Sequence, residues 1–345
     1  MKPQFENKVK RIGVLTSGGD APGMNAAVRA VVRTAMYRGI ECVGIRRGYS
    51  GLINGDVMRM DASSVAHIIN RGGTILYTAR SEEFRTKEGR AMAYRTCKLL
   101  GLDGLVCIGG DGTFSGALAL SNEYPISVVG IPATIDNDIG CSHYSIGYDT
   151  AANTAIEAID KLRDTMQSHE RCSVIEVMGH HAGNLALYVG IATGATAVLV
   201  PEEPWDFEEH VAEKIRNARL AGRTHFMVVV AEGATQKVSS DHGGENVGGA
   251  GDQVAKLISS ELGLDPRVTV LGHVQRGGSP TARDRVTATR MGYKAVNVLA
   301  EGGTNRIIVH EGGKVYDVDM VEGLQMQNSL NPDEQAVLTA MTQSY

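Results

Sequence analysis

Short apolar runs that end in glycine recur along the chain and predict buried strands. Seven runs follow this pattern, at residues 12–20, 41–48, 104–113, 126–138, 172–183, 225–233 and 267–278. Near-continuous apolar runs are typical of parallel strands that are covered on both faces. Segments that read as helices separate them, at 24–38, 61–71, 149–168, 206–221, 250–262 and 281–300. Strands that alternate with helices predict βαβ units and one or two doubly wound sheets.

The chain length is compatible with about two domains. It has 345 residues, and a domain takes roughly 150. No proline- or serine-rich linker divides it, and only residues 139–148 suggest a change of sheet. Residues 236–252 are polar and rich in glycine, which predicts a surface excursion to which we assign no chemistry.

Composition narrows the class of protein and its partners. Apolar residues make up 43% of the chain, charged residues 21%, and the net charge is -5 at pH 7. This balance is globular and argues against a nucleic-acid partner. No apolar run approaches the roughly 18 residues that cross a bilayer, and the first residues lack a signal-peptide core, so we expect no membrane partner and a cytoplasmic location. The five cysteines form no CxxC motif, which favours reduced thiols over zinc ligands.

Two glycine turns follow predicted strands and are candidates for phosphate binding. In TSGGDAPGMN (16–25), glycines such as Gly19 let backbone N–H groups approach an anion near a helix N-terminus. The alternative is an ordinary tight turn in which Asp20 or Asn25 caps the helix. In GGDGT (109–113), Asp111 could hold Mg²⁺ while neighbouring amides bind phosphate oxygens, or it could cap the next helix.

Paired carboxylates follow the fourth predicted strand. In PATIDNDI (132–139), Asp136 and Asp138 are two residues apart and share a side if the segment is extended. Like charges this close raise at least one pKa, which is how a carboxylate base can be prepared. The alternative is a loop rich in Asp and Asn that closes the strand.

Basic residues gather at the later strands and suggest a second anion site. Arginine binds phosphate through a bidentate fork, and histidine adds a donor without a permanent charge. Each residue could instead be a surface ion-pair partner or a buried histidine. Glu232 could accept a hydrogen bond from a sugar hydroxyl or could only cap a strand. The basic residues are Arg171, His180, His181, Arg267, His273 and Arg276.

Taken in order, these motifs resemble those of bacterial-type ATP-dependent 6-phosphofructokinases. The matching segments run from about residue 10 to about residue 320: GGDAPGMNA, INRGGT with Arg80 after it, GGDGT, PATIDND, MGHHAG, EG at 232–233 and GHVQRGGSP. GGDGT also occurs in NAD kinases and diacylglycerol kinases, whereas PATIDND followed by GHVQRGGSP is specific.

The resemblance implies two Rossmann-like α/β/α sandwich domains with mostly parallel sheets. ATP binds the first domain, expected at 1–145 plus about 276–302. Fructose 6-phosphate binds the second, expected at about 146–275 plus about 303–325, and 326–345 form a C-terminal helical segment. The implied reaction moves the ATP γ-phosphoryl group to the 1-hydroxyl of fructose 6-phosphate and gives fructose 1,6-bisphosphate, a glycolytic step that requires Mg²⁺.

The resemblance also assigns roles to residues of this chain. Asp136 matches the catalytic base and Asp111 the Mg²⁺ ligand. The nucleotide site matches Gly19, Arg80, Ser81, Gly110, Asp111, Gly112 and Thr113. The sugar-phosphate site matches Thr134, Asp136, Asp138, Arg171, Met178, Gly179, His180, Glu232, Arg267, His273 and Arg276.

Arg171 and Arg267 match residues that reach in from a neighbouring subunit, which implies a homotetramer with shared sites. His180 stands where the family usually has arginine, so a fixed charge is replaced by a titratable one. At the family's allosteric effector site, which lies between subunits, the arginines that bind nucleotide phosphate are matched in this chain by Arg29, Arg33 and Arg163. Because Ala62, Thr196 and Thr224 occupy charged positions of regulated relatives, we expect a weak response to ADP and phosphoenolpyruvate.

Two other functions compete with this interpretation. Pyrophosphate-dependent phosphofructokinases resemble the chain but typically carry an aspartate at the position of Gly112 and a lysine at that of Ala133, so both residues favour ATP. A non-catalytic sugar-phosphate sensor on the same fold is the second alternative. Intact Asp111 and Asp136 speak against it, because a pure binder gains little from paired carboxylates.

Overall fold

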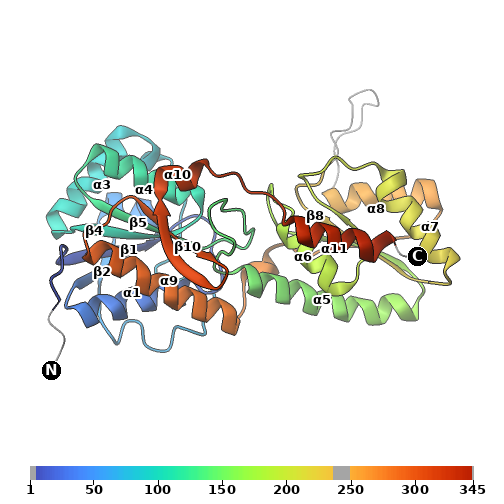
Figure 1. Cartoon of the computed structure of the whole chain (residues 1–345), viewed down its shortest axis with the longest axis horizontal. Coiled ribbons are helices and arrows are strands. Elements are labelled where there is room, and N and C mark those ends of the chain that lie inside the picture. The colour runs from blue at the N-terminus through green and yellow to red at the C-terminus, as the bar shows by residue number, and fades with distance from the viewer. Residues whose placement is uncertain (1–4, 236–248, 344–345) are drawn as a thin grey trace. The chain divides into compact units, whose positions relative to one another are not determined.

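The computed structural model describes residues 5–235 and 249–343, which fold into two compact units (Figure 1). Unit 1 comprises Met1–Ile135, Ile139–Thr150 and Arg276–Asn328. Unit 2 comprises Asp136–Asp138, Ala151–Gln275 and Ser329–Tyr345. The chain therefore passes between the units several times, and one crossing lies within the PATIDND motif.

In the described residues, unit 1 is built on a seven-stranded sheet with the order β11-β10-β5-β4-β1-β2-β3. The neighbours from β10 to β2 pair parallel, and β11 and β3 pair antiparallel at the two edges. The strands are β1 (Arg11–Thr16), β2 (Glu41–Ile45), β3 (Val57–Met60), β4 (Gly104–Gly109), β5 (Ser127–Pro132), β10 (Arg306–Glu311) and β11 (Lys314–Asp319).

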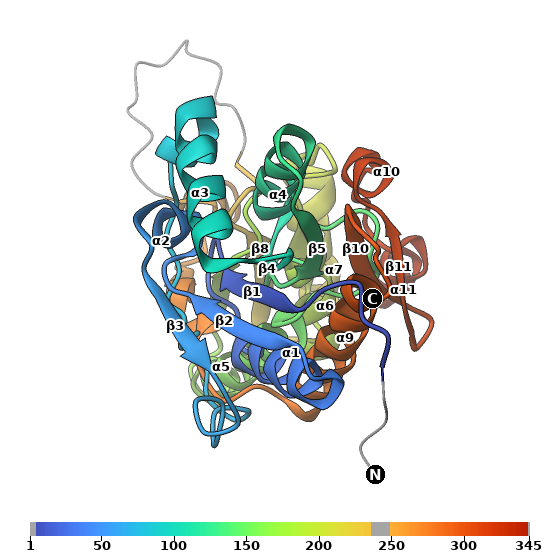
Figure 2. The same ribbon diagram turned by 90° about the vertical axis from the view of Figure 1, so that its left-hand side faces the viewer.

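Helices cover both faces of this sheet and complete three layers (Figure 2). One face carries α1 and α9. These two helices approach closely because Gly292 has no side chain: a Cβ there would lie only 2.7 Å from the Ala30 Cβ. The other face carries α3 and α4. The helical segments of unit 1 are α1 (Met24–Arg38), α2 (Gly48–Asn54), η1 (Glu83–Arg85), α3 (Lys87–Leu100), α4 (Asp111–Glu123), α9 (Ala282–Ala300) and α10 (Met320–Gln325).

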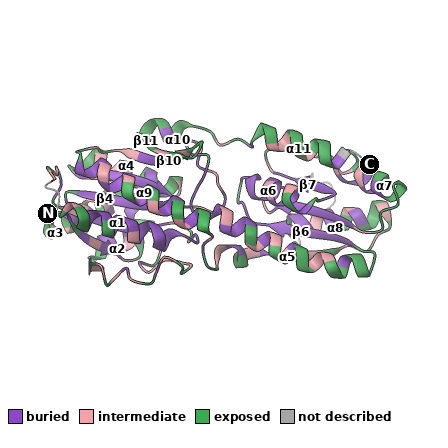
Figure 3. Cartoon of the chain, turned by 60° about the horizontal axis from the view of Figure 1, so that its bottom comes forward, coloured by how far each residue is buried: buried purple, intermediate pink, exposed green. Residues whose placement is uncertain are grey.

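Unit 2 holds a parallel four-stranded sheet, again counted over described residues, with the order β7-β8-β6-β9. Its strands are β6 (Cys172–Val177), β7 (Ala197–Leu199), β8 (Phe226–Ala231) and β9 (Arg267–Val270). Every residue of β6 and β8 is buried, whereas the helices turn exposed faces outward (Figure 3). The helical segments are α5 (Tyr148–Ser168), α6 (Asn184–Thr193), η2 (Glu208–Ala212), α7 (Glu213–Leu220), α8 (Ala250–Leu262), η4 (Gly272–Arg276) and α11 (Pro332–Gln343).

The structure confirms the α/β class with mostly parallel sheets and a strand in each of the seven apolar runs. The expected helix at 61–71 is wrong. Asp61 accepts hydrogen bonds from the backbone N–H and hydroxyl groups of Ser63 and Ser64, as an N-cap residue does, but only turns follow at residues 62–67. His67 has a φ of 55°, which is incompatible with a continuous helix over 61–71.

Two longer segments of the chain also bear on the expected domains. Residues 303–325 contain β10 and β11, which pair in the sheet of unit 1, so our placement of this segment in the second domain is wrong. Of the glycine-rich segment, residues 236–248 lie outside the described part of the chain, and Gly249 precedes α8. None of the described helices is both long enough and apolar enough to cross a membrane.

Candidate active site

Three motif segments leave the sheet of unit 1 side by side. Thr16 pairs with Ile108, and Gly109 pairs with Pro132, so β1, β4 and β5 end at the same edge. The chain continues from β1 toward β2 on one side and from β4 toward β5 on the other. In parallel α/β sheets, ligands bind at the carboxyl ends of strands where the order reverses in this way. The edge carries TSGGD, GGDGT and PATID.

The GGDGT turn requires glycine at its first position. A Cβ on Gly109 would lie 2.4 Å from both the Ser17 carbonyl oxygen and Thr113 Oγ1. Tyr49 Oη donates a hydrogen bond to the Thr113 carbonyl oxygen at 2.5 Å, and Thr113 Oγ1 donates to the Ser17 carbonyl oxygen at 3.3 Å. These contacts fix the turn against the end of β1.

Helix α4 begins within this motif, at Asp111, with Gly110 at the N-cap. Gly110 has no side chain to cap the helix, so the first N–H groups of α4 are suited to bind an anion. Asp111 is the first helical residue and is exposed, so it is not the cap that the alternative interpretation required.

The first glycine turn contacts an arginine that we expected at the sugar phosphate. A Cβ on Gly19 would lie 2.7 Å from Arg276 Nη1, and the same nitrogen donates to the Asp20 carbonyl oxygen at 3.3 Å. Helix α1 starts with Gly23 at its N-cap, so neither Asp20 nor Asn25 caps it. Asn25 instead donates to the carbonyl oxygens of Arg71 and Gly72, which ties INRGGT to α1.

The segment after PATIDND returns to the GGDGT turn. A Cβ on Gly110 would lie 4.0 Å from Ile139 Cδ1. Burial raises the pKa of Cys141 to about 11, and the negative charge of Asp111 adds to the rise. Asp111 therefore lies within electrostatic reach of Cys141.

The PATIDND motif itself bends, so its two aspartates do not lie on an extended strand. Ile135 and Asp136 form a turn, and Asn137 has a φ of 50°. Asp136 is 8% exposed, and Asp138 is half-buried. Before the bend, the Thr134 carbonyl oxygen accepts a hydrogen bond from Ser145 Oγ at 2.6 Å.

In unit 2, Glu232 holds the MGHH turn. Val177 pairs with Ala231, so β6 and β8 end together and Glu232 lies beside the residues that follow β6. Glu232 Oε1 accepts hydrogen bonds from the backbone N–H groups of Gly179 at 3.3 Å and His180 at 2.8 Å. His180 is exposed and has a φ of 54°. This carboxylate shapes the backbone that follows Met178.

Arg171 and Arg267 lie at the opposite edge of that sheet. Arg171 precedes β6, and Arg267 opens β9, where it pairs with Ser173. At about 3.3 Å per residue, the six residues of β6 separate this edge from Met178 by about 20 Å. The chain therefore does not bring these arginines to its own Gly179 and Glu232. His273 follows β9 and is exposed.

The three candidate allosteric arginines are divided between the units. Arg29 and Arg33 line a pocket of 430 Å³, to which α9 contributes Arg290 and Lys294. Arg163 lies on α5, and its guanidinium group donates a hydrogen bond to the Thr193 carbonyl oxygen.

The donors at this site fit a metal ion that binds together with a substrate phosphate. Among described residues, no group of three or more His, Cys, Asp or Glu side chains could hold a metal ion. Mg²⁺ is commonly held by one or two carboxylates together with substrate phosphates. An exposed Asp111 beside a turn suited to phosphate fits Mg²⁺ that arrives with a nucleotide.

Comparison with known proteins decides the family. The family described as "Phosphofructokinase" matches residues 11–299. The chain belongs to the phosphofructokinase family. The resemblance inferred from the motifs is thereby confirmed.

Relatives of this phosphofructokinase cover nearly its whole length. It is 52% identical over 323 residues to "ATP-dependent 6-phosphofructokinase 1" of Clostridium perfringens, covering 94% of this chain and 96% of the relative. It is 48% identical over 334 residues to "ATP-dependent 6-phosphofructokinase" of Clostridium botulinum, covering 97% and 100%. The solved phosphofructokinase of Saccharomyces cerevisiae matches with a TM-score of 0.86 and 33% identity, over 97% of this chain and 47% of the yeast chain.

Two buried residues that support the glycine turns of unit 1 were missed by the sequence analysis. Tyr49 is buried and hydrogen bonds to GGDGT, and Asp284 is fully buried at the start of α9. Tyr49 follows the predicted strand at 41–48 and Asp284 lies in the predicted helix at 281–300. Neither position gives a local signal of such a role, because a pattern of apolar residues reports spacing and not hydrogen-bond partners.

The effect of the Asp111 charge on Cys141 can be tested by alkylation. At pH 8, we expect Cys141 to react with iodoacetamide about a hundredfold more slowly than an ordinary cysteine, because its thiolate is scarce at a pKa of about 11. Asp111→Asn should accelerate the reaction severalfold by removing the negative charge. Mass spectrometry identifies the modified residue, and Asp103→Asn is the control. Equal rates in wild type and Asp111→Asn would contradict the placement.

Proposed function

We propose that this phosphofructokinase is an ATP-dependent 6-phosphofructokinase of glycolysis. It transfers the γ-phosphoryl group of ATP to the 1-hydroxyl of fructose 6-phosphate, and the products are ADP and fructose 1,6-bisphosphate. Unit 1 binds the nucleotide at Gly19, Arg80, Ser81 and the run from Gly110 to Thr113. Unit 2 contributes most of the sugar-phosphate contacts. The cytoplasm, where glycolysis takes place, is the expected compartment.

The space at Gly112 is the observation that carries the choice of ATP. Apart from its chain neighbours and the backbone of its own helix, a Cβ at this position would meet no described atom within 4 Å, so the first turn of α4 is open there. An aspartate in its place would put a second carboxylate beside Asp111, where it would repel a nucleotide phosphate. The glycine leaves this space to the nucleotide.

Phosphoryl transfer needs positioning and charge neutralisation more than covalent chemistry. Mg²⁺ held by Asp111 would neutralise phosphate charge during transfer. The amide groups at the start of α4 and of the first glycine turn orient the phosphate oxygens. Arg276 lies against that turn and supplies a fixed positive charge.

Asp136 is the proposed general base. Its carboxylate takes the proton of the sugar 1-hydroxyl while the hydroxyl oxygen bonds to the γ-phosphorus atom. The bond from that phosphorus to the bridging β-γ oxygen breaks, and ADP leaves with the electron pair. Thr134 and Asp138 flank the base. Burial of Asp136 keeps competing water away from the reacting hydroxyl.

In the proposal, the sugar phosphate is held by residues of this chain and by residues of a second subunit. In the proposed site, Glu232 organises the turn at Met178, Gly179 and His180, and His273 and Arg276 contact the sugar phosphate. Arg171 and Arg267 serve the site of a neighbouring subunit in a homotetramer. The distance of about 20 Å along β6 supports this proposal, because it keeps both arginines from their own chain's turn.

We also propose an effector site between subunits, to which Arg29, Arg33 and Arg163 contribute. The pocket that Arg29 and Arg33 line is basic, which suits a phosphate anion. Since Ala62, Thr196 and Thr224 provide no charge, we propose that ADP and phosphoenolpyruvate shift the fructose 6-phosphate dependence only weakly.

A direct assay tests the function. The protein is incubated with fructose 6-phosphate and Mg²⁺, and either ATP or pyrophosphate is added; phosphorus NMR then measures fructose 1,6-bisphosphate. We expect turnover with ATP and at least a hundredfold less with pyrophosphate. Turnover with pyrophosphate alone would assign the other enzyme class, and binding of both substrates without product would assign a sensor.

Mixed oligomers test the base and the shared arginine together. Asp136→Ser should lower kcat by about 10² to 10⁴ and leave the KM for fructose 6-phosphate nearly unchanged. Arg267→Ala should raise that KM, because a charge-assisted phosphate contact is lost. In oligomers that contain both variants, the Arg267→Ala chain keeps Asp136 and the Asp136→Ser chain keeps Arg267. A site with both residues can therefore form only between two different chains. We expect their activity to exceed that of either parent at least tenfold at low fructose 6-phosphate.

The matched control pairs Asp136→Ser with Glu232→Ala. Both of these residues serve the site of their own chain in the proposal, so mixing them restores nothing. Recovery in this control, or its absence with Arg267→Ala, would contradict the shared site.

A further inference from the structure

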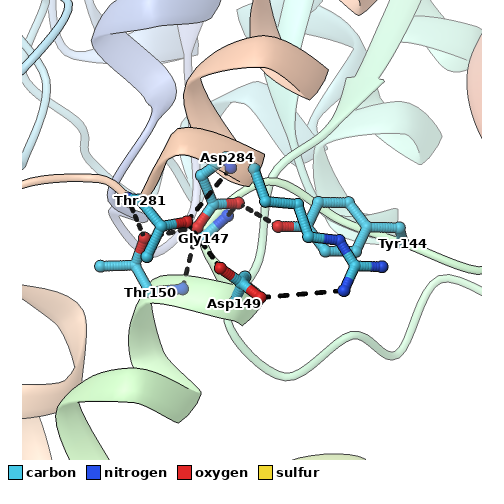
Figure 4. Close-up of polar contacts among 7 residues, drawn as sticks. Tyr144, Gly147, Asp149, Thr150, Thr281 and Asp284 are labelled. Atoms are coloured by element: carbon cyan, nitrogen blue, oxygen red, sulfur yellow. Dashed lines mark hydrogen bonds and ion pairs between the residues drawn. The ribbon is translucent and has the colours of Figure 1, made fainter.

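A buried carboxylate lies behind the candidate active site, at the first turn of α9. Asp284 is fully buried and accepts four hydrogen bonds from one segment of unit 1 (Figure 4). Its Oδ1 accepts from Tyr144 Oη at 2.5 Å and from the Gly147 N–H at 2.7 Å. Its Oδ2 accepts from the N–H of Thr150 at 2.9 Å and from the hydroxyl of the same residue at 2.5 Å. A carboxylate is an acceptor only, and here it faces donors only.

Neighbouring contacts fix the same segment to α9. Thr281 caps α9, and its Oγ1 donates to Asp149 Oδ2 at 2.6 Å. The Thr281 N–H donates to Thr150 Oγ1 at 3.0 Å. The Arg283 guanidinium group lies 4.4 Å from the centroid of the Tyr144 ring and 3.7 Å from Asp149 Oδ1. Tyr144 keeps its proton, because burial and the charge of Asp284 raise its pKa.

The segment that Asp284 holds, Tyr144–Thr150, packs against the PATIDND motif and is called the backing segment below. Ile146 forms a parallel bridge with Ala133, and its N–H donates to the Pro132 carbonyl oxygen at 3.1 Å. Ser145 Oγ donates to the Thr134 carbonyl oxygen. Three consecutive residues of PATIDND thus rest on Ser145 and Ile146, which lie between the anchors Tyr144 and Gly147.

Asp284 also adjoins the first glycine turn. A Cβ on Gly23 would lie 2.6 Å from Ile146 Cγ2 and 3.5 Å from the Asp284 Cβ. A Cβ on Gly147 would lie 2.7 Å from the Ala21 Cβ. The space around this carboxylate is therefore filled, so the backing segment has little freedom to adopt a second position.

We propose that Asp284 is a positioning residue for phosphoryl transfer: it holds Tyr144–Thr150 on α9 and thereby fixes the backbone of Pro132–Thr134 that leads to Asp136. The inference rests on the proposed function, because Asp136 has its role only in that reaction. A displacement of about 1 Å at a reacting group can cost about a hundredfold in rate, so the loss of one anchor should lower kcat.

The test removes one anchor and leaves the carboxylate in place. Tyr144→Phe deletes one hydrogen bond to Asp284 but keeps the ring beneath Arg283. We expect kcat to fall about tenfold at saturating substrates and at a temperature well below unfolding. Tyr316→Phe is the matched control, since Tyr316 donates to Glu311 near the exposed turn of the β10-β11 hairpin, and its kcat should equal that of wild type. Asp284→Asn, which turns an amide toward two donors, should lower kcat further.

A second background separates positioning from stability. If Tyr144 and Asp284 act through Asp136, then Tyr144→Phe should change the residual rate of Asp136→Ser by less than twofold. A further tenfold loss in that background would overturn the proposal. A lower Tm of Tyr144→Phe with unchanged kcat would overturn it as well, because the network would then be only structural. Absence of ATP-dependent turnover in the wild type would instead refute the proposed function.

Discussion

The close contact of two backbone turns at Gly109 is the constraint on which the site of unit 1 depends. The end of β4 passes so near Ser17 and Thr113 that a single Cβ would collide with both at 2.4 Å. Because β1 and β4 pair up to Thr16 and Ile108, this contact sets the two glycine turns side by side at one sheet edge. Backbone N–H groups, which need no side chain, can then converge on one anion.

The remaining parts of the site are arranged around that contact. Helix α4 begins immediately after it and presents Asp111, and the strand beside it continues into the bend that carries Asp136. Behind the bend, a buried carboxylate on α9 holds the backing segment with four hydrogen bonds. Rigid backbone places the charges in this design, which suits a reaction that depends on positioning.

The sequence predicted most of the central strands, because these strands are largely buried. Strands such as β4 and β6 are buried at every residue, so they appear as continuous apolar runs. Four of the described strands were missed: β3, β7, β10 and β11. Two of them, β3 and β11, are edge strands that are only partly buried and mix apolar with charged residues. The other two are short on apolar sequence, because β7 has three residues and β10 has three buried residues between charged ends. The helix expected at 61–71 is absent, and His67 within it has a positive φ that a helical period cannot reveal.

The candidate site was predictable only where the chemistry is local. Glycine turns and adjacent carboxylates can be identified from a few consecutive residues, and the predicted motifs do meet at the sheet edge. The contact of Arg276 with Gly19 and the network of Asp284 join segments far apart in the chain, which no pattern encodes. The expected roles of Arg171 and Arg267 came from the family resemblance, since their positions before and at the start of strands carry no such information.

The central claim is that the two glycine turns of unit 1 form the nucleotide site. Amide hydrogen exchange, measured with and without Mg²⁺ and a non-hydrolysable ATP analogue, tests it most directly. The account predicts slower exchange at residues 18–23 and 110–113, and no comparable change there when fructose 6-phosphate is added alone. Protection by the analogue at 178–181 and 231–233 of unit 2, with the two turns unchanged, would contradict it.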